Sequence, residues 1–167
     1  MMRSLLLRGA LAFAFAFAFA LALAGPPANA ADEGTVVERV SAAELQRIFG
    51  NLGYTGSEID DDGDLIVRMQ GYPVLVLVGS YDGAYISLTT AFAETTATLA
   101  TVNAWNRDKR FSRAYLDSEM DPVVEAELDL AAGVTIGRIR DFIQTFGQLS
   151  LPDFVAAVAV PAGRKST

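Results

Sequence analysis

Apolar and polar residues follow two different periods along this chain, and the periods predict where helices and strands lie. Three stretches repeat apolar side chains every three or four residues, the spacing of one helix face: 41–53, 96–108 and 136–146. Five stretches have the alternating or continuous apolar pattern of strands: 65–70, 74–78, 85–89, 114–117 and 124–130. The predicted order is therefore helix, three strands, helix, two strands, helix.

Short local signals indicate where these elements begin and end. Ser41 and Glu44 have the spacing of a capping box, in which each side chain bonds the other residue's backbone N–H, so a helix should begin at Ser41. An Asp-Gly pair at 82–83 is typical of a two-residue hairpin turn. Gly147 should interrupt the last helix, and Pro152 should start a further helical turn.

The connections between the predicted strands are short, except where the 96–108 helix intervenes, and short connections favour an antiparallel sheet. Helices can then cover one face of that sheet. We therefore predict an α+β fold of order α-β-β-β-α-β-β-α, with a mostly antiparallel five- to six-stranded sheet covered by helices. Residues 31–167 should form this single domain, with a core over about 40–158 and a short polar tail after it.

The first thirty residues have the pattern of a secretory signal peptide. Arg3 and Arg8 give a basic start, residues 11–24 form an apolar run without a charge, and 28–30 is a small-x-small cleavage site. The run is shorter than the about 20 residues that a membrane span needs, and an uncleaved anchor is the alternative. We predict cleavage after Ala30 and a periplasmic or secreted protein.

Composition narrows the chemistry. The chain has 20 acidic and 13 basic side chains and a formal net charge of −7. Loss of Arg3 and Arg8, two of the 13 basic residues, with the signal peptide would lower it to −9. Such a protein is repelled by nucleic acid and by anionic membrane surfaces, so we predict neither as a partner. The absence of histidine and cysteine from the sequence excludes histidine-based catalysis, histidine-ligated zinc and disulfides.

An acidic segment precedes the first predicted strand. Glu58, Asp60, Asp62 and Gly63 fit positions 1, 3, 5 and 6 of a calcium loop. Position 12, where such a loop has a bidentate glutamate, is Met69, and the flanking residues predict strand rather than helix. We therefore predict an acidic hairpin turn, with a calcium-responsive structural module as the alternative.

Two asparagines lie in the predicted second helix. At about 100° per residue, Asn103 and Asn106 fall on the stripe of Leu99 and Val102, so both amides should face the apolar side. A buried amide without partners costs about 1–3 kcal/mol. We therefore predict hydrogen bonds to the backbone of the turn at 111–113, with a ligand-binding role as the alternative.

Basic residues are concentrated at the end of the same helix: Arg107, Lys109, Arg110 and Arg113. In an acidic chain we predict that they pair with acids of the chain itself, such as Glu125, Glu127 and Asp129. The alternative is a site for an acidic peptide or a phosphate. Trp105, the only tryptophan, lies on the flank of the helix stripe and should belong to the core or to an interface.

Residues 103–117, NAWNRDKRFSRAYLD, combine an asparagine, a Trp-Asn pair, a basic run, an aromatic residue and an Arg-x-Tyr-Leu-Asp strand. This block resembles the centre of the YbjN family of bacterial proteins, and the resemblance extends over about 40–158. It implies the fold of the class I type III secretion chaperones, and some members of the family are described as sensory transduction regulators. It implies no catalytic residue.

The resemblance and the signal peptide together lead us to expect an exported, non-catalytic YbjN-like domain. We expect it to bind a protein or peptide in a chaperone-like or regulatory role, as a homodimer, and we predict no cofactor and no metal site. The candidate partner-binding residues are those of the motif: Asn103, Trp105, Asn106, Arg107, Arg110, Arg113 and Tyr115. A small carboxylate-based enzyme is the alternative from another class, because paired acids can catalyse without histidine.

Overall fold

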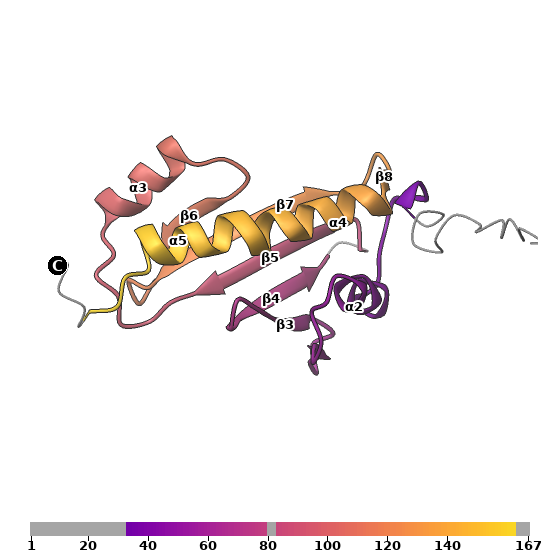
Figure 1. The fold of residues 1–167 in the computed structure, drawn as a ribbon, viewed down its shortest axis with the longest axis horizontal. Helices are drawn as coiled ribbons and strands as arrows, with labels where there is room; N and C mark the ends of the chain where they lie inside the picture. Colours follow the sequence, from indigo (N-terminus) through magenta and orange to yellow (C-terminus); the bar gives the residue numbers. More distant parts are fainter. Residues whose placement is uncertain (1–32, 80–82, 163–167) are drawn as a thin grey trace, which may run out of the picture.

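The computed structural model describes residues 33–79 and 83–162. The predicted signal peptide, and Asp82 of the predicted hairpin turn, lie outside the described residues. The elements follow in this order along the chain (Figure 1): β1 (Val36–Val37), α2 (Ala42–Asn51), β2 (Glu58–Ile59), β3 (Leu65–Met69), β4 (Tyr72–Val78), β5 (Tyr85–Ala91), α3 (Leu99–Asp108), β6 (Arg113–Leu116), β7 (Pro122–Asp129), β8 (Val134–Thr135), α4 (Ile136–Thr145), η1 (Phe146–Ser150) and α5 (Leu151–Ala157).

The longer strands form one six-stranded antiparallel sheet in the order β2-β3-β4-β5-β7-β6. A separate two-stranded sheet joins β1 to β8. The predicted α+β class, the antiparallel sheet and the order of the main elements are confirmed. The sequence pattern does not predict the two-residue strands β1, β2 and β8, because so short a strand shows no period.

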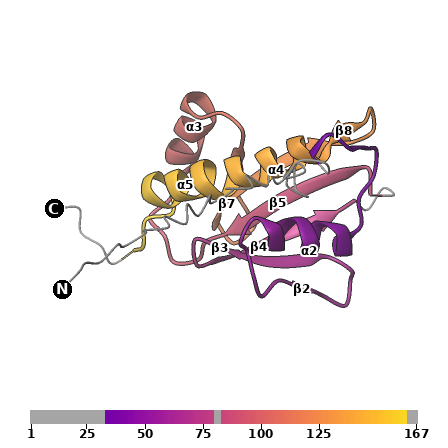
Figure 2. The same ribbon diagram turned by 45° about the vertical axis from the view of Figure 1, so that its right-hand side comes forward.

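Helices cover one face of the six-stranded sheet. In Figures 1 and 2, α2 lies over β3 and β4, and the segment from α4 to α5 lies over β5 and β7. The largest side chains of these helices are fully buried: Leu45, Phe49, Ile139, Ile143 and Phe154. Burial of each such side chain contributes about 1.5–3 kcal/mol. None of the helices within the described residues is long and apolar enough to cross a membrane.

The start of α2 confirms the predicted capping box. Ser41 Oγ accepts the N–H of Glu44 at 3.2 Å, and the Glu44 carboxylate accepts the N–H of Ser41 at 2.8 Å. Hydrogen bonds from the Ser41 hydroxyl and backbone lower the pKa of Glu44, because they favour its ionised form. The residues therefore begin the helix where the sequence places it.

The last helical segment corrects a prediction. Gly147 does not interrupt it, since α4 continues through the π turn η1 into α5. A Cβ at Gly147 would lie 2.6 Å from Tyr54 Oη, so close packing explains the glycine. The N–H of Leu151 bonds the carbonyl of Phe146, five residues back, which makes the turn wider than an α turn. Pro152 follows in the first turn of α5, where a missing N–H is tolerated.

The acidic segment forms a hairpin turn between β2 and β3, as predicted. The N–H of Asp60 bonds the carbonyl of Asp64 at 2.9 Å. Asp60 Oδ1 accepts the N–H groups of Asp62 and Asp64 at 3.0 and 2.9 Å. Among residues 33–79 and 83–162, no three acidic side chains are grouped so that they could hold a metal ion.

Candidate functional site

The motif of residues 103–117 lies where α3 ends and the chain turns into β6, an edge strand of the sheet. The last turn of α3 closes with a hydrogen bond from the Lys109 N–H to the carbonyl of Trp105 at 2.8 Å. Phe111, in the turn, has a φ of 68°, a left-handed conformation that residues with a side chain rarely adopt. Phe111 is 69% exposed. A strained backbone that presents an aromatic ring to solvent marks Phe111 as a candidate contact residue.

Asn106 fixes the geometry of this reversal. Its Nδ2 donates to the carbonyl of Ala114 at 2.9 Å, and its Oδ1 accepts the N–H of Ala114 at 2.8 Å. The predicted hydrogen bonds from Asn106 to the main chain are confirmed, although the partner is the second residue of β6 rather than the turn at 111–113. Asn106 thereby takes the bonds that another strand would use at this edge.

The buried face of α3 differs from the predicted stripe. Leu99 is 70% exposed, and Asn103 is also exposed, whereas Val102 and Trp105 are buried. The reason is that α3 lies at the edge of the sheet, where only one narrow side of the helix meets α5 and β6. Trp105 packs edge-on against Phe154, with ring centres 5.1 Å apart. The prediction that both asparagines face the core is therefore wrong, and the prediction that Trp105 is a core residue is confirmed.

One of the predicted ion pairs forms on the sheet. Arg113, which is mostly exposed, pairs with Glu125, whose side chain is buried. The hydrogen bond to Glu125 raises the pKa of Arg113. The guanidinium also lies 5.7 Å from the ring centre of Tyr115. Burial, followed by the charge of Glu125, raises the pKa of Tyr115. Arg113 therefore serves as the counter-ion of a buried acid.

The other three basic residues behave differently from one another. Arg107 pairs with its neighbour Asp108 at 2.7 Å. Lys109 pairs with Asp153 of α5, also at 2.7 Å. In the described part of the chain, the Arg110 guanidinium bonds only backbone carbonyls and no carboxylate. The prediction that these residues pair with acids of the chain itself is therefore confirmed for Arg107, Lys109 and Arg113. Of the acids named as examples only Glu125 is a partner, because Arg107 and Lys109 lie on α3 and its end, away from β7.

The open part of the sheet edge lies on β7, which is longer than β6. The last pair between the two strands joins Arg113 to Glu125. Beside β5, however, β7 continues to Asp129. Among the described residues, positions 126–129 therefore have a strand neighbour on one side only.

The direction of the backbone groups on this edge follows from the bonds of Asn106. Because Asn106 reaches Ala114 from the outer side of β6, Ala114 and Val124 form a non-hydrogen-bonded pair of the ladder. Hydrogen-bonded and non-hydrogen-bonded residues alternate along an antiparallel strand. The N–H and C=O of Glu127 must therefore point to the open side, beyond the end of β6.

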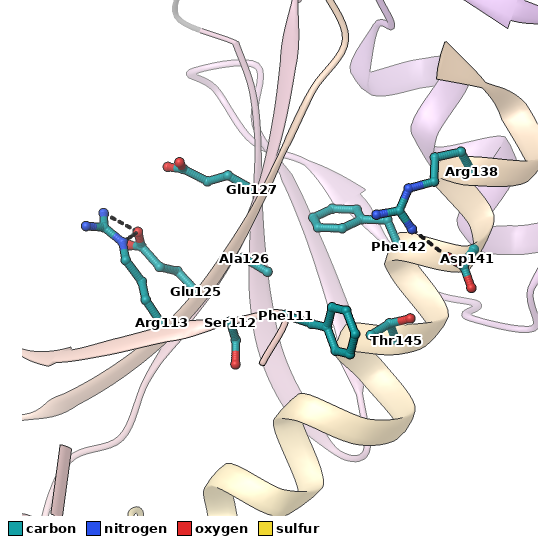
Figure 3. A pocket seen from close by; sticks show the side chains of 10 residues that line it. All are labelled: Phe111, Ser112, Arg113, Glu125, Ala126, Glu127, Arg138, Asp141, Phe142 and Thr145. Atoms are coloured by element: carbon teal, nitrogen blue, oxygen red, sulfur yellow. Dashed lines mark hydrogen bonds and ion pairs between the residues drawn. The ribbon is translucent and has the colours of Figure 1, made fainter. Parts of the chain in front are cut away.

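A groove of about 470 Å³ lies at this open edge, between β7 and α4 (Figure 3). We call it the Phe111 groove, and six of its lining residues matter here: Phe111, Ala126, Glu127, Arg138, Asp141 and Phe142. In Figure 3, the two phenylalanine rings and the ion pair of Arg138 with Asp141 lie on one side of the strand, and Arg113 with Glu125 lies on the other. The groove thus combines open backbone groups, aromatic side chains and charges of both signs.

The structure does not bring the seven predicted motif residues together into one site. Arg113 lines the Phe111 groove, and Trp105 and Arg110 line a smaller pocket on the other side of Phe111. Tyr115 lies on the sheet face away from the helices, and Asn103 is exposed on α3. Sequence reasoning missed Phe111, whose signal is a large aromatic residue in a polar run, and the groove residues of α4, which no linear spacing relates to the motif.

The fold is similar to that of type III secretion chaperones. A chain in the solved complex of the Yersinia pestis chaperone SycH with a stable fragment of YscM2 superposes with a TM-score of 0.50 at 14% identity, over 70% of this chain and 98% of that chain. A chain in the HopA1–SchA chaperone–effector complex superposes with a TM-score of 0.45 at 11% identity, over 64% of this chain and 85% of that chain. No curated protein matches the sequence.

The family is shown by the sequence itself. The YbjN family model, described as "Putative bacterial sensory transduction regulator", matches residues 41–156. The chain therefore belongs to the YbjN family, as its Trp-Asn motif indicated.

Proposed function

We propose that this chain is a non-catalytic, chaperone-like domain that binds a partner polypeptide by adding an extended segment of it to the open edge of β7. The observation that carries the proposal is the position of the Phe111 groove beside that edge. The backbone groups of Glu127 would supply hydrogen bonds, and Phe111 and Phe142 would supply apolar contacts for alternate side chains of the added strand.

The two halves of this sheet edge support the proposal by their difference. An open strand edge invites association, so proteins normally block it. Asn106 blocks the β6 half by bonding both backbone groups of Ala114. At Glu127, no side chain of the described residues does the same. The protein therefore closes one half of the edge and keeps open the half that lies in the groove.

Photo-crosslinking in cells tests this function. Phe111 is replaced by a photoreactive phenylalanine analogue, and the protein is irradiated and its adducts are identified. We expect a discrete crosslinked partner polypeptide. Met120 is the matched control position, because it is also apolar, 61% exposed and left-handed, with a φ of 66°, but does not line the groove.

A second substitution tests strand addition itself. Glu127→Pro removes the N–H that the added strand would use, and proline is tolerated where that N–H faces away from the ladder. We expect the crosslink at position 111 to disappear while the protein stays folded by circular dichroism. Equal crosslinking at positions 111 and 120, or an unchanged crosslink with Glu127→Pro, would show that the groove is not the binding site.

We also propose that the protein works outside the cytoplasm. The support is the order of the basic start, the apolar run and the cleavage site in residues 1–30. Intact mass of the protein from its native cell fraction should give a mature chain that begins at Ala31. Recovery of the full-length chain in the membrane pellet would favour an uncleaved anchor instead.

A further inference from the structure

A second, smaller pocket lies on the other side of Phe111, between α3 and the segment of η1 and α5. Its volume is about 160 Å³. We call it the Trp105 pocket, and the residues used below are Trp105, Lys109, Arg110, Leu149, Ser150 and Asp153. Phe111 lines both the Phe111 groove and the Trp105 pocket, so a segment bound in the groove would also lie close to the pocket.

Two residues that line the Trp105 pocket each carry a buried polar atom without a hydrogen-bond partner among the described residues, Trp105 Nε1 and Ser150 Oγ. Trp105 is 3% exposed and Ser150 is 2% exposed. An indole N–H can only donate, and a hydroxyl can donate too. Ser150 also belongs to the π turn η1, and π turns are frequent at functional sites. Both groups are therefore available to donate to an acceptor that comes within hydrogen-bond distance.

An internal ion pair lies across this pocket. Lys109 Nζ is 2.7 Å from Asp153 Oδ2 and 5.6 Å from the centre of the Trp105 ring. Trp105 and Lys109 also line a neighbouring cavity of about 180 Å³, so the lysine stands between two adjoining spaces. Both side chains of the pair are 42% exposed. Because water competes with the attraction between two such exposed charges, another carboxylate can replace Asp153 at Lys109 at little cost.

Arg110 is a second cation at the pocket. Its guanidinium bonds the carbonyls of Arg107 and Lys109 at 3.4 and 3.2 Å, and no carboxylate within the described residues. Asp108, the acid that precedes Lys109 and also lines the pocket, is paired with Arg107 instead. Exposed apolar side chains, Phe111 and Leu149, flank it. The pocket is thus complementary to an anion that is attached to an apolar segment.

We propose that the Trp105 pocket binds an aspartate or glutamate carboxylate of the partner polypeptide. This carboxylate replaces Asp153 as the counter-ion of Lys109 and accepts hydrogen bonds from Trp105 Nε1 and Ser150 Oγ. Arg110 provides the second positive charge. In the free protein Asp153 is therefore the counter-ion of Lys109, and in the complex the partner's carboxylate takes over this role. The inference rests on the proposed function and adds the chemistry of the partner to it.

Two synthetic peptides test the inference. Both are fluorescently labelled, blocked at their ends and built from alternating residues, one Leu-Glu-Leu-Glu-Leu and the other Leu-Gln-Leu-Gln-Leu. Fluorescence anisotropy with the purified protein gives their dissociation constants. We expect the glutamate peptide to bind at least about tenfold more tightly, because only its carboxylates match the pocket's donors. Emission of Trp105, the only tryptophan in the sequence, should change with the glutamate peptide alone.

Three variants locate the effect. Asp153→Asn removes the internal competitor, so the glutamate peptide should bind more tightly, by about threefold or more. Arg110→Gln should weaken its binding by a similar factor. The matched control is Arg68→Gln, because Arg68 is also exposed and bonds a backbone carbonyl, that of Gly71, but lies on β3, far from the pocket in the sheet. This control should leave the dissociation constant unchanged.

The outcomes separate the two proposals. If both peptides bind equally and Glu127→Pro abolishes both, strand addition stands and the carboxylate pocket is wrong. If the glutamate peptide binds more tightly but Asp153→Asn weakens it, exchange with Asp153 is wrong. If neither peptide binds at about 1 mM, well above the range of specific contacts, both proposals fail.

Discussion

Two neighbouring residues of α3, Asn106 and Trp105, show opposite uses of a polar group. Asn106 is exposed, yet both ends of its amide bond the backbone of Ala114. Trp105 is buried, yet its indole N–H has no partner in the described part of the chain, and the same holds for Ser150 Oγ. The exposed amide of Asn106 is thus hydrogen-bonded within the fold, whereas the buried Trp105 Nε1 and Ser150 Oγ are not.

The difference teaches how to separate structural from binding residues within one motif. A polar group that bonds the protein's own backbone contributes to stability, and its loss should destabilise the fold. A buried donor without a partner inside the protein costs stability, so it is a candidate to bind an acceptor that arrives from outside. Substitutions at residues of the two kinds should therefore differ in what they change, stability for the first and binding for the second.

Replacing Asn106 should have the largest effect on stability. Asn106→Ala leaves the N–H and C=O of Ala114 without partners, and Ala114 is only 5% exposed. We expect a loss of about 1–3 kcal/mol in the free energy of unfolding, measured by urea denaturation. Asn103→Ala is the matched control, because Asn103 is the same residue one turn earlier and is exposed. It should stay within about 0.5 kcal/mol of the parent.

A conservative variant sharpens this result. Asn106→Asp keeps an oxygen that can accept the Ala114 N–H but loses the donor to the Ala114 carbonyl. Its second carboxylate oxygen would face the Ala114 carbonyl oxygen, which it repels, so this variant should cost more than Asn106→Ala. If Asn106→Ala has the same free energy of unfolding as Asn103→Ala but loses the crosslinked partner, Asn106 is a binding residue. Bonds to the backbone would then not distinguish structural residues from binding residues.

Ser41, the cap of α2, also bonds the protein's own backbone, so its replacement should destabilise the fold, but by less than Asn106→Ala. Ser41→Ala removes the acceptor of the Glu44 N–H and should destabilise by about 1 kcal/mol at neutral pH. Hydrogen bonds from Ser41 lower the pKa of Glu44 below 4.5, so ionised Glu44 stabilises the folded state above that pH and loses this contribution as pH falls through its folded pKa. The cost of Ser41→Ala in urea unfolding should therefore shrink as the pH falls below 4.5 and through the lowered pKa of Glu44.

Removing an unused polar group should have almost no cost. Ser150→Ala deletes a buried hydroxyl without a partner and leaves the backbone of η1 unchanged. We expect the free energy of unfolding to stay within about 0.5 kcal/mol of the parent, or to rise slightly. The same variant should weaken binding of the glutamate peptide. A loss of stability as large as that of Asn106→Ala would mean that the hydroxyl has a partner inside the fold.

Much of the fold could be predicted because periodic burial dominates it. The strand at β7 alternates, the stripe of α4 has helical spacing, and Ser41 with Glu44 marks the start of α2. The helix at α3 was harder, because a helical wheel shows which residues share a face but not which face meets the protein. Leu99 is exposed for this reason, since α3 packs at an edge rather than across the sheet.

The candidate site could be predicted only in part. The motif indicated the α3–β6 region, and Trp105 and Arg110 do line a pocket there. The open edge of β7 depends on the relative lengths of β6 and β7 and on their register, which a linear pattern does not fix. The partner of Lys109 comes from α5, and the α4 residues that line the groove with Phe111 lie 27 or more residues later in the sequence. Only packing brings these residues close.

The smallest expected effect is that of calcium on the melting temperature. It tests whether the acidic side chains of the β2–β3 turn serve the fold or bind a cation. Asp60 Oδ1 already accepts two backbone N–H groups, so one carboxylate of the turn is used to close the β2–β3 hairpin. A cation would have to displace these bonds, and position 12 of a calcium loop is Met69, which is fully buried.

We therefore expect the same melting temperature in millimolar calcium and in chelator. A site filled to 100 times its dissociation constant would add about 2.7 kcal/mol, which a thermal melt detects as a rise of several degrees. Asp60→Asn keeps an acceptor for the backbone N–H groups and should change stability little in either condition. A rise in melting temperature with calcium that Asp60→Asn abolishes would place this turn with the binding residues instead.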